Sequence, residues 1–87
     1  MNRREEVRQV FMAAKEKGLP LLACFIKADD SNRHMLCSHR GGRTRRPWLL
    51  AVWDIADNGR KTVNLDTTYR IVNPVTGEIL FDKPLEP

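Results

Sequence analysis

Gly18 and Pro20 divide this 87-residue chain into two parts with different hydrophobic periods. Before them, apolar residues recur at the spacing i, i+3, i+4 and i+7, which is typical of one face of an amphipathic helix. Asn2 is suited to cap the start of this helix, and Gly18 can supply the left-handed residue that ends it. Because Pro20 prevents continuation, the sequence predicts a helix over residues 3–17.

After Pro20, short runs of β-forming residues alternate with turn residues, which predicts antiparallel strands. The length of the run 48–55 permits a strand or a short helix, but Asn58-Gly59 directly behind it favours a strand that ends in a hairpin. We expect an α+β fold in a single domain, residues 1–87, with one N-terminal helix packed on a small sheet of four or five strands. The expected strands cover residues 21–28, 33–39, 48–55, 62–72 and 78–82.

The positive charge of the chain is concentrated in one segment. The net charge is +4, and five of the 15 basic residues lie between Ser31 and Trp53, where there is no Asp or Glu. The rest of the chain therefore carries ten basic residues (15 minus five) against 11 acidic ones. A localised positive field attracts anions, so the segment is expected to hold the binding site.

The loop 40–47 combines arginines with glycines and is followed by a tryptophan. Arginine grips phosphate through two N–H groups and stacks on flat rings, and glycine lets a ligand approach the backbone. Trp48 and Trp53 would point to opposite faces of one strand, so we expect Trp53 in the core and Trp48 at the rim. The candidate binding residues are Arg33, Arg40, Gly41, Gly42, Arg43, Arg45, Arg46 and Trp48, with Arg3 and Arg4 as auxiliary contacts.

This basic loop indicates a small accessory or regulatory protein that contacts the phosphates of DNA or RNA. The alternative is an adaptor or inhibitor that docks the same loop on an acidic surface of a larger protein, such as a nucleic-acid-processing enzyme. Arginine and tryptophan are enriched at the centres of protein interfaces, so this alternative stays open. A third interpretation is a solvated loop that only maintains solubility.

Cys24, Cys37 and His39 are the candidates for a metal site. A hairpin that turns at Asp30-Ser31 would pair Cys24 with Cys37 and place His39 on the same face. Zinc sites use four ligands at paired short spacings, and a fourth ligand is missing here, so we interpret the cysteines as small buried hydrophobes and expect neither metal nor cofactor. No oxyanion hole or cleft accompanies a Cys37–His39 pair, and we expect that the protein is not an enzyme.

The start of the sequence lacks the apolar segment of a secretory signal, and no apolar run approaches the ~20 residues of a membrane span. With two cysteines and no such signal, a reducing compartment is expected, and we predict a cytoplasmic protein without membrane association. An exposed edge strand could pair with a second copy of the chain, so a homo-oligomer stays open.

Overall fold

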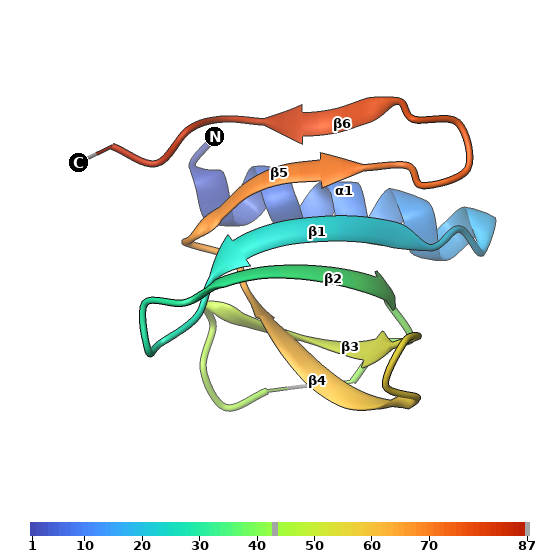
Figure 1. The fold of residues 1–87 in the computed structure, drawn as a ribbon, viewed down its shortest axis with the longest axis horizontal. Coiled ribbons are helices and arrows are strands. Elements are labelled where there is room, and N and C mark those ends of the chain that lie inside the picture. The colour runs from blue at the N-terminus through green and yellow to red at the C-terminus, as the bar shows by residue number, and fades with distance from the viewer. Residues whose placement is uncertain (43, 87) are drawn as a thin grey trace.

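The computed structural model describes residues 1–42 and 44–86, which form one helix followed by a six-stranded antiparallel sheet (Figure 1). The elements are α1 (Arg3–Lys17), β1 (Leu21–Ile26), β2 (Asn32–Ser38), β3 (Leu49–Asp54), β4 (Gly59–Asn64), β5 (Thr68–Val72) and β6 (Ile79–Asp82). The strand order is β4-β3-β2-β1-β5-β6. The α+β class with an N-terminal helix is confirmed, and the strand at 48–55 is observed as β3, but the expected number of strands is wrong.

The sixth strand arises because the expected strand 62–72 is divided in two by a turn. The side chain of Asn64 accepts a hydrogen bond from the amide of Asp66 at 3.0 Å, and the Asn64 carbonyl oxygen accepts one from the amide of Thr67 at 3.3 Å. Such local bonds stabilise a turn in competition with a continuous strand. β4 therefore pairs with β3, and after this turn the chain continues as β5, which pairs with β1.

Both ends of α1 follow the capping rules that the sequence predicts. The side chain of Asn2 accepts a hydrogen bond from the amide of Glu5 at 2.9 Å, and Gly18 adopts a left-handed conformation with φ of 66°. Val7, Phe11 and Ala14 form the buried stripe of the helix. Across the described ranges, no helix combines the length and apolar character needed to cross a membrane.

The β1–β2 hairpin has a different register from the one that we expected. Cys37 lies opposite Leu21, and Cys24 lies opposite His34, so the predicted Cys24–Cys37 pair is wrong. The turn spans residues 27–31, and its Asp30 takes a positive φ of 65°. The carboxylate of Asp29 accepts hydrogen bonds from the amide and the hydroxyl of Ser31, which stabilises this longer turn.

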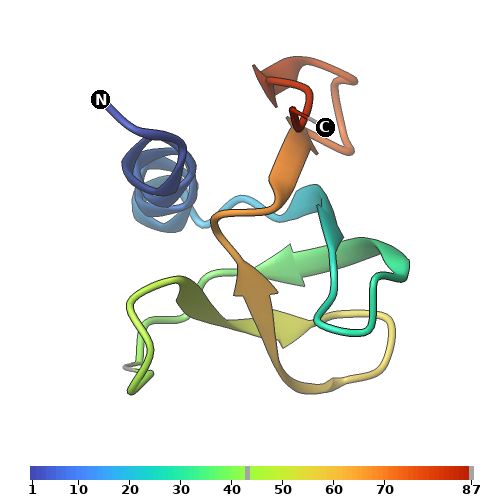
Figure 2. The ribbon, with the colours of Figure 1, turned by 90° about the vertical axis from the view of Figure 1, so that its left-hand side faces the viewer.

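The β3–β4 hairpin diverges from the strand beside it. β3 and β4 pair at six positions, whereas β2 and β3 pair only at Cys37–Asp54 and Ser38–Trp53. In Figure 2, β4 crosses β3 and its end leads directly toward β5, and β4 also contacts β1. The inner residues of the hairpin, Leu50, Val52 and Val63, are buried in the same core as the helix stripe, so one face of the hairpin is covered by protein and the other is not.

Substitution of Phe11 by alanine tests the packing of the helix on this core. Phe11 has no exposed surface, and we expect Phe11→Ala to lower the free energy of unfolding by about 3–5 kcal/mol. The adjacent Met12 is 52% exposed, so Met12→Ala is the matched control and should change stability by less than about 0.5 kcal/mol. Chemical denaturation gives both values. Equal effects of the two substitutions would contradict the described packing.

Candidate nucleic-acid interface

The basic loop between β2 and β3 is fixed to the rest of the fold at several points. The hydroxyl of Thr44 lies 2.8 Å from the carbonyl oxygen of Leu49, and the guanidinium of Arg8 donates a hydrogen bond to the carbonyl oxygen of Pro47 at 2.7 Å. The loop is therefore attached to both α1 and β3. Arg43, one of the predicted binding residues, lies outside the described residues.

Two glycines give the first half of the loop its path. Gly41 and Gly42 have φ of 83° and 113°, which residues with a side chain rarely adopt. A Cβ atom on Gly41 would also lie 2.9 Å from Nζ of Lys15. The two glycines therefore shape the loop and bring it close to α1.

Each tryptophan of the chain lies beneath an arginine of the loop. The guanidinium carbon of Arg40 is 4.8 Å from the ring centroid of Trp53, and that of Arg46 is 5.9 Å from the ring centroid of Trp48. Both distances fall within the range of cation–π attraction. The loop thus presents two arginine–tryptophan pairs.

One of the two tryptophans lies where the sequence predicts it, and the other does not. Trp48 is 37% exposed at the start of β3, as expected for a rim residue. Trp53 is only half-buried, so the prediction that it lies in the core is wrong. The even-numbered residues of β3 point inward, so Trp53 lies on the outer face of the hairpin.

Three arginines of the loop have no acidic partner in the described part of the chain. Arg40, Arg45 and Arg46 are exposed, and none of them forms an ion pair with a described carboxylate. Their charges are therefore available to an anionic ligand. This is the condition that the binding hypothesis requires of them.

Arg33 differs from the loop arginines because it forms an ion pair within the fold. Its guanidinium donates a hydrogen bond to the carboxylate of Asp54 at 2.9 Å and lies 3.8 Å from that of Asp57. Asp54 is fully buried. The pKa of Asp54 is lowered by the hydrogen bond from the amide of Asp57, and further by Arg33. Arg33 thus ties β2 to the β3–β4 hairpin.

The auxiliary candidates Arg3 and Arg4 also contact the protein itself. The Arg3 guanidinium donates hydrogen bonds to the carbonyl oxygens of Thr68 at 2.9 Å and Pro84 at 2.8 Å. Arg4 forms two hydrogen bonds with the carboxylate of Asp66, at 2.9 and 2.8 Å. These contacts hold the first turn of the helix, and the structure does not bring either residue to the basic loop.

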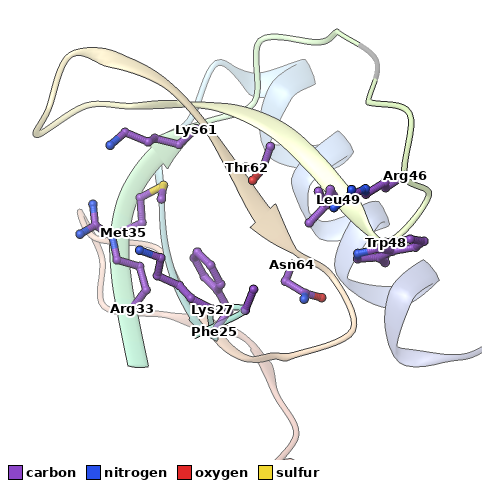
Figure 3. A pocket seen from close by; sticks show the side chains of 11 residues that line it. Phe25, Lys27, Arg33, Met35, Arg46, Trp48, Leu49, Lys61, Thr62 and Asn64 are labelled. Carbon is purple, nitrogen blue, oxygen red and sulfur yellow. The ribbon is translucent and has the colours of Figure 1, made fainter. Parts of the chain in front are cut away.

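A pocket of about 330 Å³ opens where the β3–β4 hairpin diverges from β2. Figure 3 shows Arg33 and Lys61 on one side of it and Arg46 and Trp48 on the other, with Phe25 between them. No acidic side chain is among its described lining residues. Those residues are Phe25, Lys27, Ala28, Arg33, Met35, Arg46, Trp48, Leu49, Lys61, Thr62 and Asn64.

The pocket adds two cations that the sequence alone did not identify. Lys27 comes from the β1–β2 turn and Lys61 from β4, so only the fold brings them to Arg46 and Trp48. Lys61 lies 3.3 Å from the carboxylate of Asp57, but this is a surface pair of low strength. An anion in the pocket could therefore compete with Asp57 for Lys61.

Cys24, Cys37 and His39 do not converge on one metal site in the described part of the chain. Cys24 and Cys37 occupy positions of opposite parity on adjacent strands that pair Cys24 with His34, so their side chains point to opposite faces of the sheet. The ring of His39 packs edge-on against Phe11 with centroids 6.4 Å apart. No group of three potential metal ligands occurs among the residues that the structure describes.

Comparison with protein-family models, curated proteins and solved structures found no match to this chain. Its function is therefore inferred from the geometry of the site alone.

Substitution of Asp54 by asparagine tests the link between β2 and the hairpin. Because the amide side chain keeps the shape but loses the charge, we expect Asp54→Asn to lower the free energy of unfolding by about 1.5–3 kcal/mol. Chemical denaturation at neutral pH measures the loss. Asp82→Asn is the matched control, since its partner Arg70 is 50% exposed and the pair is 3.5 Å apart. It should change stability by less than about 1 kcal/mol.

The stability difference between the wild type and Asp54→Asn is expected to depend on pH. The pKa of Asp54 is lowered from its ordinary value of 3.8, so its contribution is fully present above that value and is lost as the pH falls through the folded pKa. The stability difference between the wild type and Asp54→Asn should therefore shrink as the pH is lowered below about 4. A difference that stays constant down to acid unfolding would contradict the assignment.

Cys37 should react slowly with alkylating reagents. Burial, with a smaller effect of the Asp54 carboxylate, raises the pKa of its thiol from 9.0 to about 12. The thiolate is the reactive form, so iodoacetamide at about pH 8 should label Cys37 in the folded protein far more slowly than in the urea-unfolded protein. Mass spectrometry of tryptic peptides measures both rates. Equal rates would show that Cys37 is accessible and reopen the nucleophile hypothesis.

Proposed function

We propose that this protein binds nucleic acid through the basic loop and the pocket beside it, as a small accessory or regulatory protein without catalytic activity of its own. The proposal depends on one observation. Arg40, Arg45 and Arg46 are exposed and have no carboxylate partner among the described residues. Other arginines of the chain, such as Arg4 and Arg33, are paired with acids. The proposal keeps the expected cytoplasmic location, where DNA and RNA are accessible.

The chemistry of the pocket favours a nucleotide over a simple anion. Phosphate would be held by Arg46 and Lys27, while the ring of Trp48 offers a surface on which an unpaired base can stack. Thr62 and Asn64 on the same wall supply hydrogen-bonding groups for a base or a sugar. A mixture of cations, an aromatic ring and amide groups is typical of sites for single-stranded nucleic acid.

An adaptor that docks the same arginines on an acidic protein surface is the alternative. Such an interface needs the charges but does not need the tryptophan rings to be free for stacking on bases. The two functions therefore respond differently to a probe that carries carboxylates without bases. Poly-glutamate is such a probe, and it can be compared directly with a labelled oligonucleotide.

The proposal is tested by a titration of labelled single-stranded DNA and RNA over a salt series, read by fluorescence anisotropy. With about four phosphate contacts, the logarithm of the binding constant should fall with the logarithm of the salt concentration with a slope of about −3. The variant Arg40→Gln/Arg45→Gln/Arg46→Gln should weaken binding by at least about 10-fold and make the slope less negative by about 2. Glutamine keeps part of each side-chain stem, and circular dichroism verifies the fold.

The matched control is Lys17→Gln/Arg70→Gln/Lys83→Gln, which removes three charges away from the loop. It should change the slope by less than about 1, because these cations are not expected to contact the ligand. Absence of binding to both DNA and RNA at low salt, or a flat salt response, would overturn the proposal. Binding of poly-glutamate as tight as that of the oligonucleotide would overturn it in favour of the adaptor.

A further inference from the structure

The outer face of the β3–β4 hairpin runs from Trp53 to the pair Leu49–Asn64, which borders the pocket of Trp48 and Arg46. Three cross-strand pairs point outward along this face, namely Leu49–Asn64, Ala51–Thr62 and Trp53–Arg60. Each of these six residues is exposed or half-buried, while the inner residues of the hairpin are buried. None of the six is acidic. The face therefore carries no negative charge, holds Trp53 and Arg60 at one end and adjoins the pocket of Trp48 and Arg46 at the other.

Two pockets border this face, and each is lined by one member of its central cross-strand pair. The pocket around Trp48 includes Thr62, and a second pocket of about 270 Å³ around Trp53 includes Ala51. Ala51 and Thr62 are direct cross-strand partners, so lining residues of the two pockets are neighbours on this face. Both residues are small, which leaves room for a chain to pass from one pocket to the other.

The second pocket repeats the chemistry of the first. Arg40 and Arg60 line it on either side of Trp53, and neither forms an ion pair with a carboxylate of the described residues. The guanidinium of exposed Arg40 lies 4.8 Å from the Trp53 ring centroid, and a base can stack on an arginine as well as on an aromatic ring. A phosphate can then reach Arg60 on the neighbouring strand.

We propose that the outer face of the β3–β4 hairpin is a track for single-stranded nucleic acid that engages the Trp48 pocket and the Trp53 pocket at the same time. This inference rests on the proposed function and specifies its ligand. A duplex cannot stack its bases on either tryptophan without unpairing them, whereas a flexible single strand can. Trp48 and Trp53 are five positions apart in an extended segment, a length of about 17 Å, which matches about five stacked nucleotides.

The test uses the two tryptophans as separate reporters, because the chain contains only these two. Trp48→Phe leaves Trp53 as the single tryptophan, and Trp53→Phe leaves Trp48 as the single tryptophan, so tryptophan fluorescence reports on one ring at a time. Oligothymidylates of about two to about ten nucleotides are titrated into each variant. We expect a six-nucleotide strand to quench both fluorophores, and we expect affinity to rise with length up to about five nucleotides and then level off. A blunt duplex should bind at least about 10-fold more weakly at the same salt concentration.

A substitution in the middle of the track provides a second test. Thr62 is exposed, so Thr62→Glu should preserve the fold while it places a negative charge between the two pockets. We expect it to weaken the binding of a six-nucleotide strand by at least about 10-fold. Thr62→Lys should strengthen the same binding. Val75→Glu and Val75→Lys, in the exposed turn between β5 and β6, are the matched controls and should change it by less than about threefold.

The possible failures of the track and of the proposed function are distinct. If oligothymidylates quench Trp48 but not Trp53 at every length, or if the duplex binds equally well, the track is wrong while nucleic-acid binding stands. Equal effects of Thr62→Glu and Val75→Glu lead to the same conclusion. If no oligonucleotide binds at low salt by either fluorescence or anisotropy, both the track and the proposed function are wrong.

Discussion

The buried carboxylate of Asp54 holds the β3–β4 hairpin in the orientation on which the candidate interface depends. It accepts a hydrogen bond from the amide of Asp57 at 3.1 Å, which fixes the turn of the hairpin, and one from Arg33, which ties the hairpin to β2. Because the β2–β3 ladder has two paired positions, supplemented by a backbone hydrogen bond from the Ile55 amide to the Leu36 carbonyl oxygen at 2.9 Å, this side-chain link adds to a short connection. A buried carboxylate without partners is costly, so orientations of the hairpin that separate Asp54 from Arg33 are disfavoured.

The arginines of the chain divide into two groups according to what surrounds them. Arg3, Arg4, Arg8 and Arg33 each donate hydrogen bonds to an acceptor within the protein, and they join the helix, the loop and the strands to one another. The exposed arginines of the loop lie where the described chain provides no carboxylate. The net charge of the molecule is therefore a poor guide to its binding surface, since much of the positive charge stabilises the fold and only the remainder is available to a ligand.

The sequence was sufficient to predict the features that depend on neighbouring residues. The caps of α1 and the strand before Asn58-Gly59 follow from local chemistry, and both are observed. The register of the β1–β2 hairpin was not predictable in this way, because the left-handed conformation of Asp30 and the bonds of Asp29 lengthen the turn. Trp53 was misplaced because its environment depends on which face of β3 is covered. Lys27 and Lys61 reach the pocket only through pairing between strands distant in sequence, which no local pattern predicts.

The short ladder between β2 and β3 also has a consequence for motion. Regions held by few backbone hydrogen bonds open locally at a lower free energy than the whole molecule unfolds. The junction at Cys37–Asp54 and Ser38–Trp53 is such a region, so its backbone hydrogen bonds are expected to open locally more often than those in the centre of the sheet. Amide hydrogens at the junction would then exchange with solvent sooner than those in the centre of β1. A partner bound across the hairpin and the loop beside it would slow that exchange, and protection of these few amides would mark its presence.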